Sequence, residues 1–187
     1  VMDICLLHGW GVNRVVWQGI ENFYKAYGRV RSIDLPGYGE RTKETFPTQL
    51  DLVARQIADE IPADSVVIAW SLGATIALYI QIAKLIPFRA LQLISATPKF
   101  ISASNWSAGQ QPQSFARFLK AFEGNYLEAL RGFMTLQLHG DSMNTESVEN
   151  WISRLNSYPR PSQATLINGL QLLNNTDLRE DLAKISL

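Results

Sequence analysis

The chain has 187 residues, enough for one domain with a sizeable core, and its 47% hydrophobic and 18% charged residues are an ordinary globular balance. Seventeen basic and seventeen acidic residues give a formal charge of zero. This balance does not indicate a nucleic acid or an anionic membrane as a partner. No apolar stretch approaches the ~18 residues of a transmembrane helix, and no signal peptide is visible.

The first half of the chain alternates short apolar strands with helices. Strands are predicted at residues 2–7, 30–33, 65–70 and 90–94, and helices at residues 14–26, 48–61 and 72–85. In the first predicted helix, one broad apolar face would be formed by Val15, Val16, Ile20, Phe23 and Tyr24. The first strand holds the single cysteine, Cys5, which fits a reducing compartment and a cytoplasmic protein. Apolar strands alternating with helices are typical of a mostly parallel sheet covered on both faces, so we predict an α/β fold.

The pattern changes near residue 98. From there to about residue 161 no convincing strand is found, and two helical stretches, 112–123 and 125–138, are rich in aromatic and basic residues. Residues 162–174 resume a helical spacing. We therefore predict a first part of the core at residues 1–97, an inserted helical lid at 98–161, and a return to the core at 162–187.

The strongest chemical signal lies at residues 66–74, where a β-branched strand runs into a serine and an apolar helix follows at once. This context is that of a nucleophile elbow, whose sharp turn strains the serine and requires small residues two positions before and after it. Ala69 and Gly73 meet this requirement, and the helix N-terminus favours negative charge near Ser71. The alternative is an ordinary helix N-cap, where serine is common. The strand and helix context favours Ser71 as a nucleophile.

A second signal follows the first strand, where residues 8–11 are His-Gly-Trp-Gly. Acyl transfer needs two N–H donors at the oxyanion, one from the residue after the nucleophile and one from a loop after an earlier strand. The backbone N–H groups of Leu72 and Trp10 are the candidates. The alternative is a plain loop, and we expect the His8 ring to be structural. A third motif, Asp-Leu-Pro-Gly-Tyr-Gly at residues 34–39, predicts a turn in which Asp34 hydrogen-bonds the backbone.

These three motifs, in this order and at this spacing, resemble the α/β-hydrolase superfamily. Within it the chain is similar to the esterases of biotin synthesis that hydrolyse the methyl ester of a pimeloyl chain held on an acyl carrier protein. The other matching residues are Trp17, Ser95–Pro98, Phe133, Leu136, Gln137, Asn168–Leu170 and Thr176–Arg179. The resemblance implies an α/β-hydrolase fold with a helical lid and a serine carboxylesterase without cofactor, acting on an acyl-carrier-protein-bound substrate.

The resemblance also implies roles for individual residues. Ser71 would attack the ester carbonyl while the Trp10 and Leu72 amides hold the oxyanion. Trp10, Leu72, Trp70 and Phe133 would bind the substrate, and the alternative for the aromatic side chains is ordinary core packing. Basic lid residues would face an acidic carrier protein, with solvated lid charge as the alternative. The basic candidates are Arg117, Lys120, Arg131 and Arg154, and the acidic residues that dilute them are Glu123, Glu128, Glu146 and Glu149.

The acid and base of a catalytic triad are not identified by these motifs. In α/β-hydrolases an Asp or Glu and then a His follow the serine along the chain. The histidine after Ser71 is His139, a minor candidate inside the predicted lid, and the family pattern instead expects both residues beyond Leu187. The C-terminal part of the fold is therefore expected to be missing. We interpret the chain as a fragment of a longer enzyme, the alternative being a shortened and inactive hydrolase.

Two other functions stay open. A broad-specificity short-chain carboxylesterase would use the same serine, and a non-catalytic hydrolase-like module would bind a ligand in the lid pocket. No His, Cys and Asp cluster has the spacing of a metal site, and no phosphate-binding or dinucleotide fingerprint is present. We expect a monomer that binds no metal, no nucleic acid and no membrane.

Overall fold

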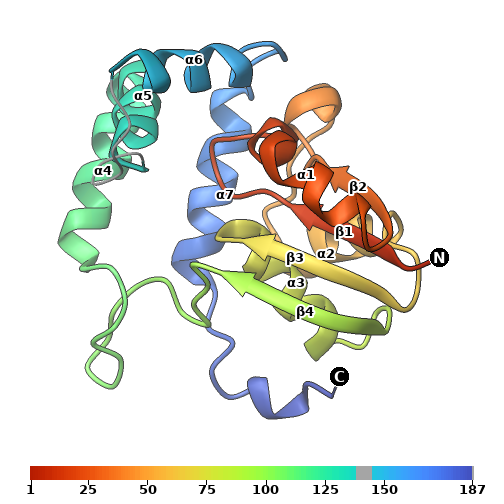
Figure 1. The fold of residues 1–187 in the computed structure, drawn as a ribbon. Coiled ribbons are helices and arrows are strands. Elements are labelled where there is room, and N and C mark those ends of the chain that lie inside the picture. The colour runs from red at the N-terminus through yellow and green to blue at the C-terminus, as the bar shows by residue number, and fades with distance from the viewer. Residues whose placement is uncertain (138–144, 187) are drawn as a thin grey trace.

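The centre of the molecule is a parallel sheet with the strand order β2-β1-β3-β4. Figure 1 shows the computed structural model, which describes residues 1–137 and 145–186. The strands are β1 (Asp3–Leu7), β2 (Arg29–Ile33), β3 (Ser65–Trp70) and β4 (Phe88–Ile94). Each pairs with its neighbour in parallel, which confirms the predicted sheet. The carboxyl ends of the strands therefore lie at one edge, where ligand sites of such sheets form.

Helices cover both faces of this sheet (Figure 1). They are α1 (Gln18–Lys25) on one face, and α2 (Leu50–Ala58) and α3 (Leu72–Ile82) on the other. The alternation of side chains along β1 explains the two layers. Ile4 and Leu6 pack with Trp17 on the α1 side, whereas Cys5 and Leu7 belong to the larger core cluster shared with α2 and α3. Both faces of the central strands are thus apolar and buried, as the sequence predicted.

The first helix differs from its expected form. Its N-terminal turn, Arg14–Trp17, is a 3-10 turn, which advances by about 120° per residue instead of the about 100° of an α-helix. Val15 in this turn is buried, whereas Ile20 and Phe23 in α1 are 38% and 59% exposed. The prediction of a single broad apolar face was therefore wrong, because the change of helical pitch separates the residues on either side of it.

The segment between β4 and the last helix is helical, as predicted. Its helices are α4 (Pro112–Gly124), α5 (Tyr126–Gln137) and α6 (Thr145–Leu155), and they are followed by α7 (Gln163–Asn175). In Figure 1, α4 and α5 stand beyond the edge to which the strands point, and α7 runs between them and the sheet. Phe122 of α4 and Met134 of α5 are buried in the main core cluster. No helix of the described residues is long and apolar enough to cross a membrane. The division into core, lid and return stays a prediction.

Candidate active site

Ser71 is the single residue between the end of β3 and the start of α3. Its backbone angles, φ 52° and ψ −115°, lie in a region that residues with a Cβ rarely adopt. Such a conformation costs about 1–3 kcal/mol and persists only where the surrounding structure imposes it. The Ser71 side chain does not cap α3, so the alternative of an ordinary helix N-cap is excluded. Ser71 is half-buried and follows the carboxyl end of β3.

The sequence around Ser71 makes this sharp turn possible. A β-carbon placed on Gly73 would lie 2.5 Å from the carbonyl oxygen of His8 and 2.9 Å from that of Leu7, so only glycine allows α3 to start this close to β1. Ala69, two residues before the serine, is fully buried. The Ser71 N–H donates to Ile94 O at the end of β4 (3.0 Å), which ties the turn to the neighbouring strand. The turn is therefore set by contacts with two adjacent strands.

The strained backbone at Ser71 gives a stability prediction. Ser71→Gly removes the Cβ that makes φ 52° unfavourable, and it also adds conformational freedom to the unfolded chain. We expect the free energy of unfolding to rise by about 1 kcal/mol, because the strain relieved exceeds that entropic loss. Ser71→Ala keeps the Cβ and should remain close to wild type. Urea denaturation of both variants measures the difference, and a glycine variant less stable than the alanine variant would contradict the strain.

Two backbone donors lie next to Ser71. A β-carbon on Gly9 would lie 3.2 Å from Ser71 Cβ, so the loop after β1 packs directly against the elbow. Neither the Trp10 N–H nor the Leu72 N–H donates a hydrogen bond to another described residue. Buried backbone N–H groups are nearly always paired, and both residues are at most 3% exposed. An oxyanion hole needs two N–H donors without other partners, and the absence of a partner for both groups among the described residues is consistent with the predicted role of Trp10 and Leu72, which stays a prediction.

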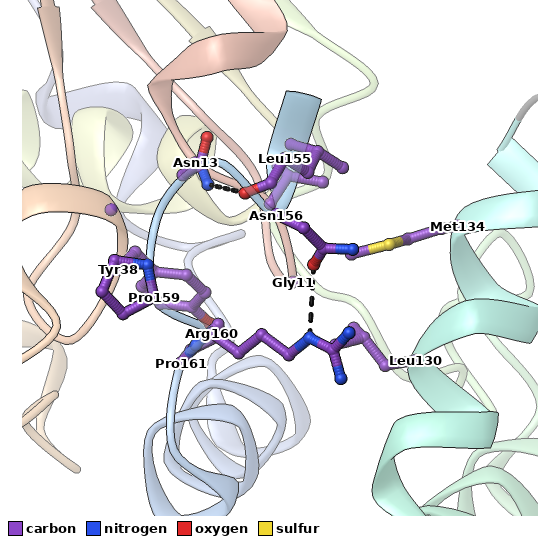
Figure 2. A pocket seen from close by; sticks show the side chains of 12 residues that line it. Gly11, Asn13, Tyr38, Leu130, Met134, Leu155, Asn156, Pro159, Arg160 and Pro161 are labelled. Atoms are coloured by element: carbon purple, nitrogen blue, oxygen red, sulfur yellow. Dashed lines mark hydrogen bonds between the residues drawn. The ribbon is translucent and has the colours of Figure 1, made fainter. Parts of the chain in front are cut away.

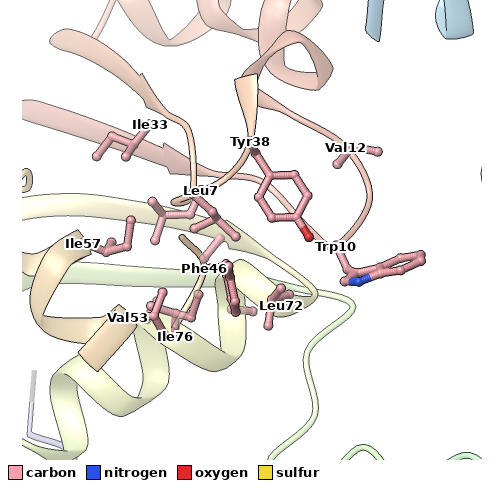
Figure 3. Packing of buried hydrophobic residues seen from close by; sticks show 14 of the residues in the cluster. Leu7, Trp10, Val12, Ile33, Tyr38, Phe46, Val53, Ile57, Leu72 and Ile76 are labelled. Carbon is pink, nitrogen blue, oxygen red and sulfur yellow. The ribbon is translucent and has the colours of Figure 1, made fainter. Parts of the chain in front are cut away.

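The side chains of Trp10 and Leu72 are packed in the core (Figure 3). The Trp10 indole donates from Nε1 to Leu166 O of α7 (2.8 Å). It also meets three phenylalanines of α4 and α5 edge-on, at centroid distances of 5.9, 5.6 and 5.0 Å for Phe118, Phe122 and Phe133. For the Trp10 ring, ordinary core packing thus describes this structure better than an open pocket wall. Trp70 and Phe133 are partly exposed and remain candidates for contact with an acyl chain.

His8 and Asp34 join the loop after β1 to the turn after β2. The buried Asp34 carboxylate accepts the backbone N–H groups of Arg14 (2.8 Å) and Glu40 (3.0 Å), as the turn motif predicted. Both ring nitrogens of His8 have partners, and the ring is fully buried. Burial lowers the pKa of His8, opposed by the negative charge of Asp34, whose Oδ1 lies 3.7 Å from Nε2. A neutral ring with both nitrogens engaged cannot serve Ser71 as a base.

Tyr38 is a feature that the sequence analysis did not single out. Its ring is fully buried, and its hydroxyl makes no hydrogen bond of ordinary geometry with another described residue. Burial raises its pKa, opposed by the nearby backbone N–H of Gly11. Tyr38 lines a cavity of about 20 Å³, room for one water molecule (Figure 2). The cavity also touches Gly11 of the loop, Met134 of α5 and Arg160. No signal in the sequence distinguished this tyrosine from any other residue of a turn.

The unpaired hydroxyl gives a second stability prediction. Tyr38→Phe removes a buried polar group without changing the shape of the core. Because the hydroxyl makes at most a weak contact with the Gly11 N–H among the described residues, we expect the unfolding free energy to stay within about 1 kcal/mol of wild type or to increase. Thermal or urea denaturation measures it. A loss of more than about 2 kcal/mol would mean that the hydroxyl is hydrogen-bonded, for example to a buried water.

The basic residues of α4, α5 and α6 are mostly solvated. Arg117, Lys120, Arg131 and Arg154 are exposed, and Arg131 pairs with the equally exposed Glu149 over 2.9 Å. For Arg131, a neighbouring glutamate therefore offsets the positive charge, as expected. The side chain of Glu146 and the whole of His139, the minor candidate for the base, lie outside the described residues.

Known proteins provide an independent comparison. The family model described as "Alpha/beta hydrolase family" matches residues 6–185. The chain is 30% identical to the pimeloyl-[acyl-carrier protein] methyl ester esterase of Vibrio vulnificus (strain CMCP6), an alignment that covers 99% of the chain and 72% of that protein. It is 31% identical to the protein of the same name from Nitrosomonas europaea, over 98% of the chain and 73% of that protein.

Solved structures agree in fold. The esterase EaEST from Exiguobacterium antarcticum superposes with a TM-score of 0.82 at 22% identity, over 100% of the chain and 71% of that structure. A hydrolase from Oleispira antarctica gives a TM-score of 0.84 at 16% identity, over 100% and 70%. A strand-to-helix elbow on a parallel sheet, a family model that matches almost the whole chain and these likenesses lead to one conclusion: the chain belongs to the α/β-hydrolase family.

Proposed function

We propose that this protein is a serine carboxylesterase that hydrolyses the methyl ester of a carrier-bound pimeloyl chain, and that it acts as a cytoplasmic monomer. The observation that carries the proposal is the strained, half-buried Ser71 near two backbone donors, Trp10 N–H and Leu72 N–H, that have no partner in the part of the chain the structure describes. The names of the 30–31% identical relatives support the substrate.

In the proposed reaction, Ser71 Oγ attacks the ester carbonyl carbon and its proton passes to a general base. The carbonyl oxygen becomes an oxyanion, which accepts hydrogen bonds from the Trp10 amide in the loop after β1 and from the Leu72 amide at the start of α3. The dipole of α3 adds positive potential there. The bond to the methoxy oxygen then breaks and methanol leaves with the proton. Water attacks the acyl-enzyme through a second oxyanion, releasing the carboxylic acid and restoring the serine hydroxyl.

The side chains around Ser71 are consistent with a substrate that has an apolar acyl chain attached to a charged carrier protein. Phe133 and Trp70 are partly exposed aromatic residues beside the loop and the elbow. Arg117, Lys120, Arg131 and Arg154 are exposed basic residues of the predicted lid, and Arg131 is paired with Glu149. Surface charge of this kind increases the rate of encounter with an acidic partner and is screened by salt.

A fluorophosphonate probe and two esters test the proposal in the full-length protein. We expect the probe to label Ser71, and we expect kcat/KM for a carrier-bound pimeloyl methyl ester to exceed that for a simple aryl ester. Equal or better use of the aryl ester would favour a broad short-chain carboxylesterase. Absence of labelling in folded protein would reject the enzyme and favour a non-catalytic binding module.

A further inference from the structure

A fully buried histidine begins the loop that carries the Trp10 amide, and the proposed reaction does not use its ring. The Leu35 N–H lies 3.0 Å from Nε2 of His8, and because a backbone N–H can only donate, Nε2 must be the acceptor. The proton of the neutral ring is therefore on Nδ1, which donates to the carbonyl oxygen of Gly9 over 2.8 Å. The tautomer follows from the two partners.

The Gly9 carbonyl and the Trp10 N–H belong to the same peptide unit. This unit is planar and trans, so the two groups point in opposite directions, and a bond that holds the carbonyl also sets the direction of the N–H. The Nδ1–H of His8 holds the carbonyl on the side of its own ring. The Trp10 N–H consequently points away from the ring, and it has no partner among the described residues. Gly9, through which this peptide is attached, packs against Ser71.

The imidazole is itself held in place from the second strand. Leu35 and Tyr38 both follow β2, the first donating to Nε2 and the second packing against the ring at a centroid distance of 5.2 Å and an angle of 67°. With both nitrogens engaged and no exposed surface, the ring cannot rotate without breaking two buried hydrogen bonds. Glycine, in contrast, restrains its own backbone less than any other residue, so Gly9 alone would leave the next peptide free to turn.

We propose that His8 is a positioning residue of the oxyanion hole, whose neutral ring sets the plane of the Gly9–Trp10 peptide and so directs the Trp10 N–H to the space beside Ser71. The catalytic consequence rests on the proposed esterase function, whereas the geometric consequence does not. The Asp-Leu-Pro-Gly-Tyr-Gly turn thereby takes part in the site, because it supplies the groups that hold the imidazole.

Two conservative variants separate the two ring nitrogens. In His8→Asn the amide NH₂ can take the place of Nδ1–H and donate to Gly9 O, while the acceptor for Leu35 is lost. In His8→Gln the longer side chain can accept from Leu35 N–H, while the donor to Gly9 is lost. We expect His8→Gln to lower kcat about 10²-fold with KM nearly unchanged, since an oxyanion donor acts mainly in the transition state. We expect His8→Asn to retain kcat within about fivefold, because the peptide plane is kept.

Two further measurements, the melting temperature and the nuclear magnetic resonance spectrum, test the proposal without relying on turnover. Melting temperatures report any general damage, and a merely structural histidine would make the kcat losses follow the stability losses in both variants, which overturns the proposal. In ¹⁵N-labelled protein, the Trp10 amide resonance should shift in His8→Gln and stay near its wild-type position in His8→Asn. If the variants do not fold, the tautomer of His8 in the wild-type protein tests the proposal, and ¹⁵N resonances of the ring report it. We expect the proton on Nδ1, and a proton on Nε2 would overturn the proposal. Failure of Ser71 to react, with these resonances as expected, would reject the esterase and not the role of His8.

Discussion

Ser71→Ala is expected to lower kcat for methyl ester hydrolysis by about 10⁴–10⁶-fold and to abolish covalent labelling by a fluorophosphonate. The alanine removes the side-chain hydroxyl of the residue between β3 and α3, while the backbone N–H groups of Trp10 and Leu72 are retained. Substrate binding should change little, since the hydroxyl contributes to bond making and not to recognition of the acyl chain. Steady-state kinetics and mass spectrometry of the labelled protein measure both effects.

Ser107→Ala is the matched control for this variant. Ser107 is exposed and lies in the segment between β4 and α4, away from the elbow. It should be labelled neither before nor after the Ser71 substitution, and its replacement should leave turnover unchanged. Full activity in Ser71→Ala, or a label on another serine, would show that the nucleophile lies elsewhere.

Gly73→Ala is expected to have the largest effect on stability. The new methyl group would lie 2.5 Å from His8 O and 2.9 Å from Leu7 O, and neither is the end of a flexible side chain that could move aside. Either the start of α3 or the end of β1 must shift. We expect a loss of about 2–4 kcal/mol in unfolding free energy, in the range of overpacked cores, and a loss of activity of about 10²-fold or more from the displaced serine.

Gly19→Ala provides the control for adding a methyl group to a glycine. Gly19 lies in α1 and no heavy atom comes within 4 Å of a β-carbon built there. Alanine should stabilise this helix by about 0.5–1 kcal/mol, because it loses less backbone entropy on folding. In urea denaturation, the unfolding free energy should therefore fall in Gly73→Ala and rise in Gly19→Ala. In esterase assays, Gly73→Ala should lose activity. A Gly73 variant that behaved like the Gly19 variant would mean that the elbow tolerates a wider turn.

Much of the fold was predictable because its signals are local. Apolar runs such as residues 65–70, followed by the long apolar helix of α3, predict β3 and α3 within a few residues of their observed bounds. The elbow was recognisable for the same reason, since its small residues, Ala69 and Gly73, are neighbours of Ser71 in the chain. The face of the first helix was not predictable, because a 3-10 turn at residues 14–17 depends on how the chain leaves the loop before it.

The sequence by itself determined that a serine stands between a buried strand and an apolar helix, and that glycine-rich loops follow the first two strands. Only the tertiary structure decided which groups meet there. It packs the Trp10 side chain in the core against three phenylalanines of α4 and α5. It leaves the Tyr38 hydroxyl without a hydrogen bond of ordinary geometry to any described residue, and it joins His8 to Gly9 and Leu35. The reason is physical. The periodicity of burial depends on residues that are neighbours in the chain, so the sequence shows it directly. The direction of a hydrogen bond depends on atoms that parallel pairing brings together from distant parts of the chain.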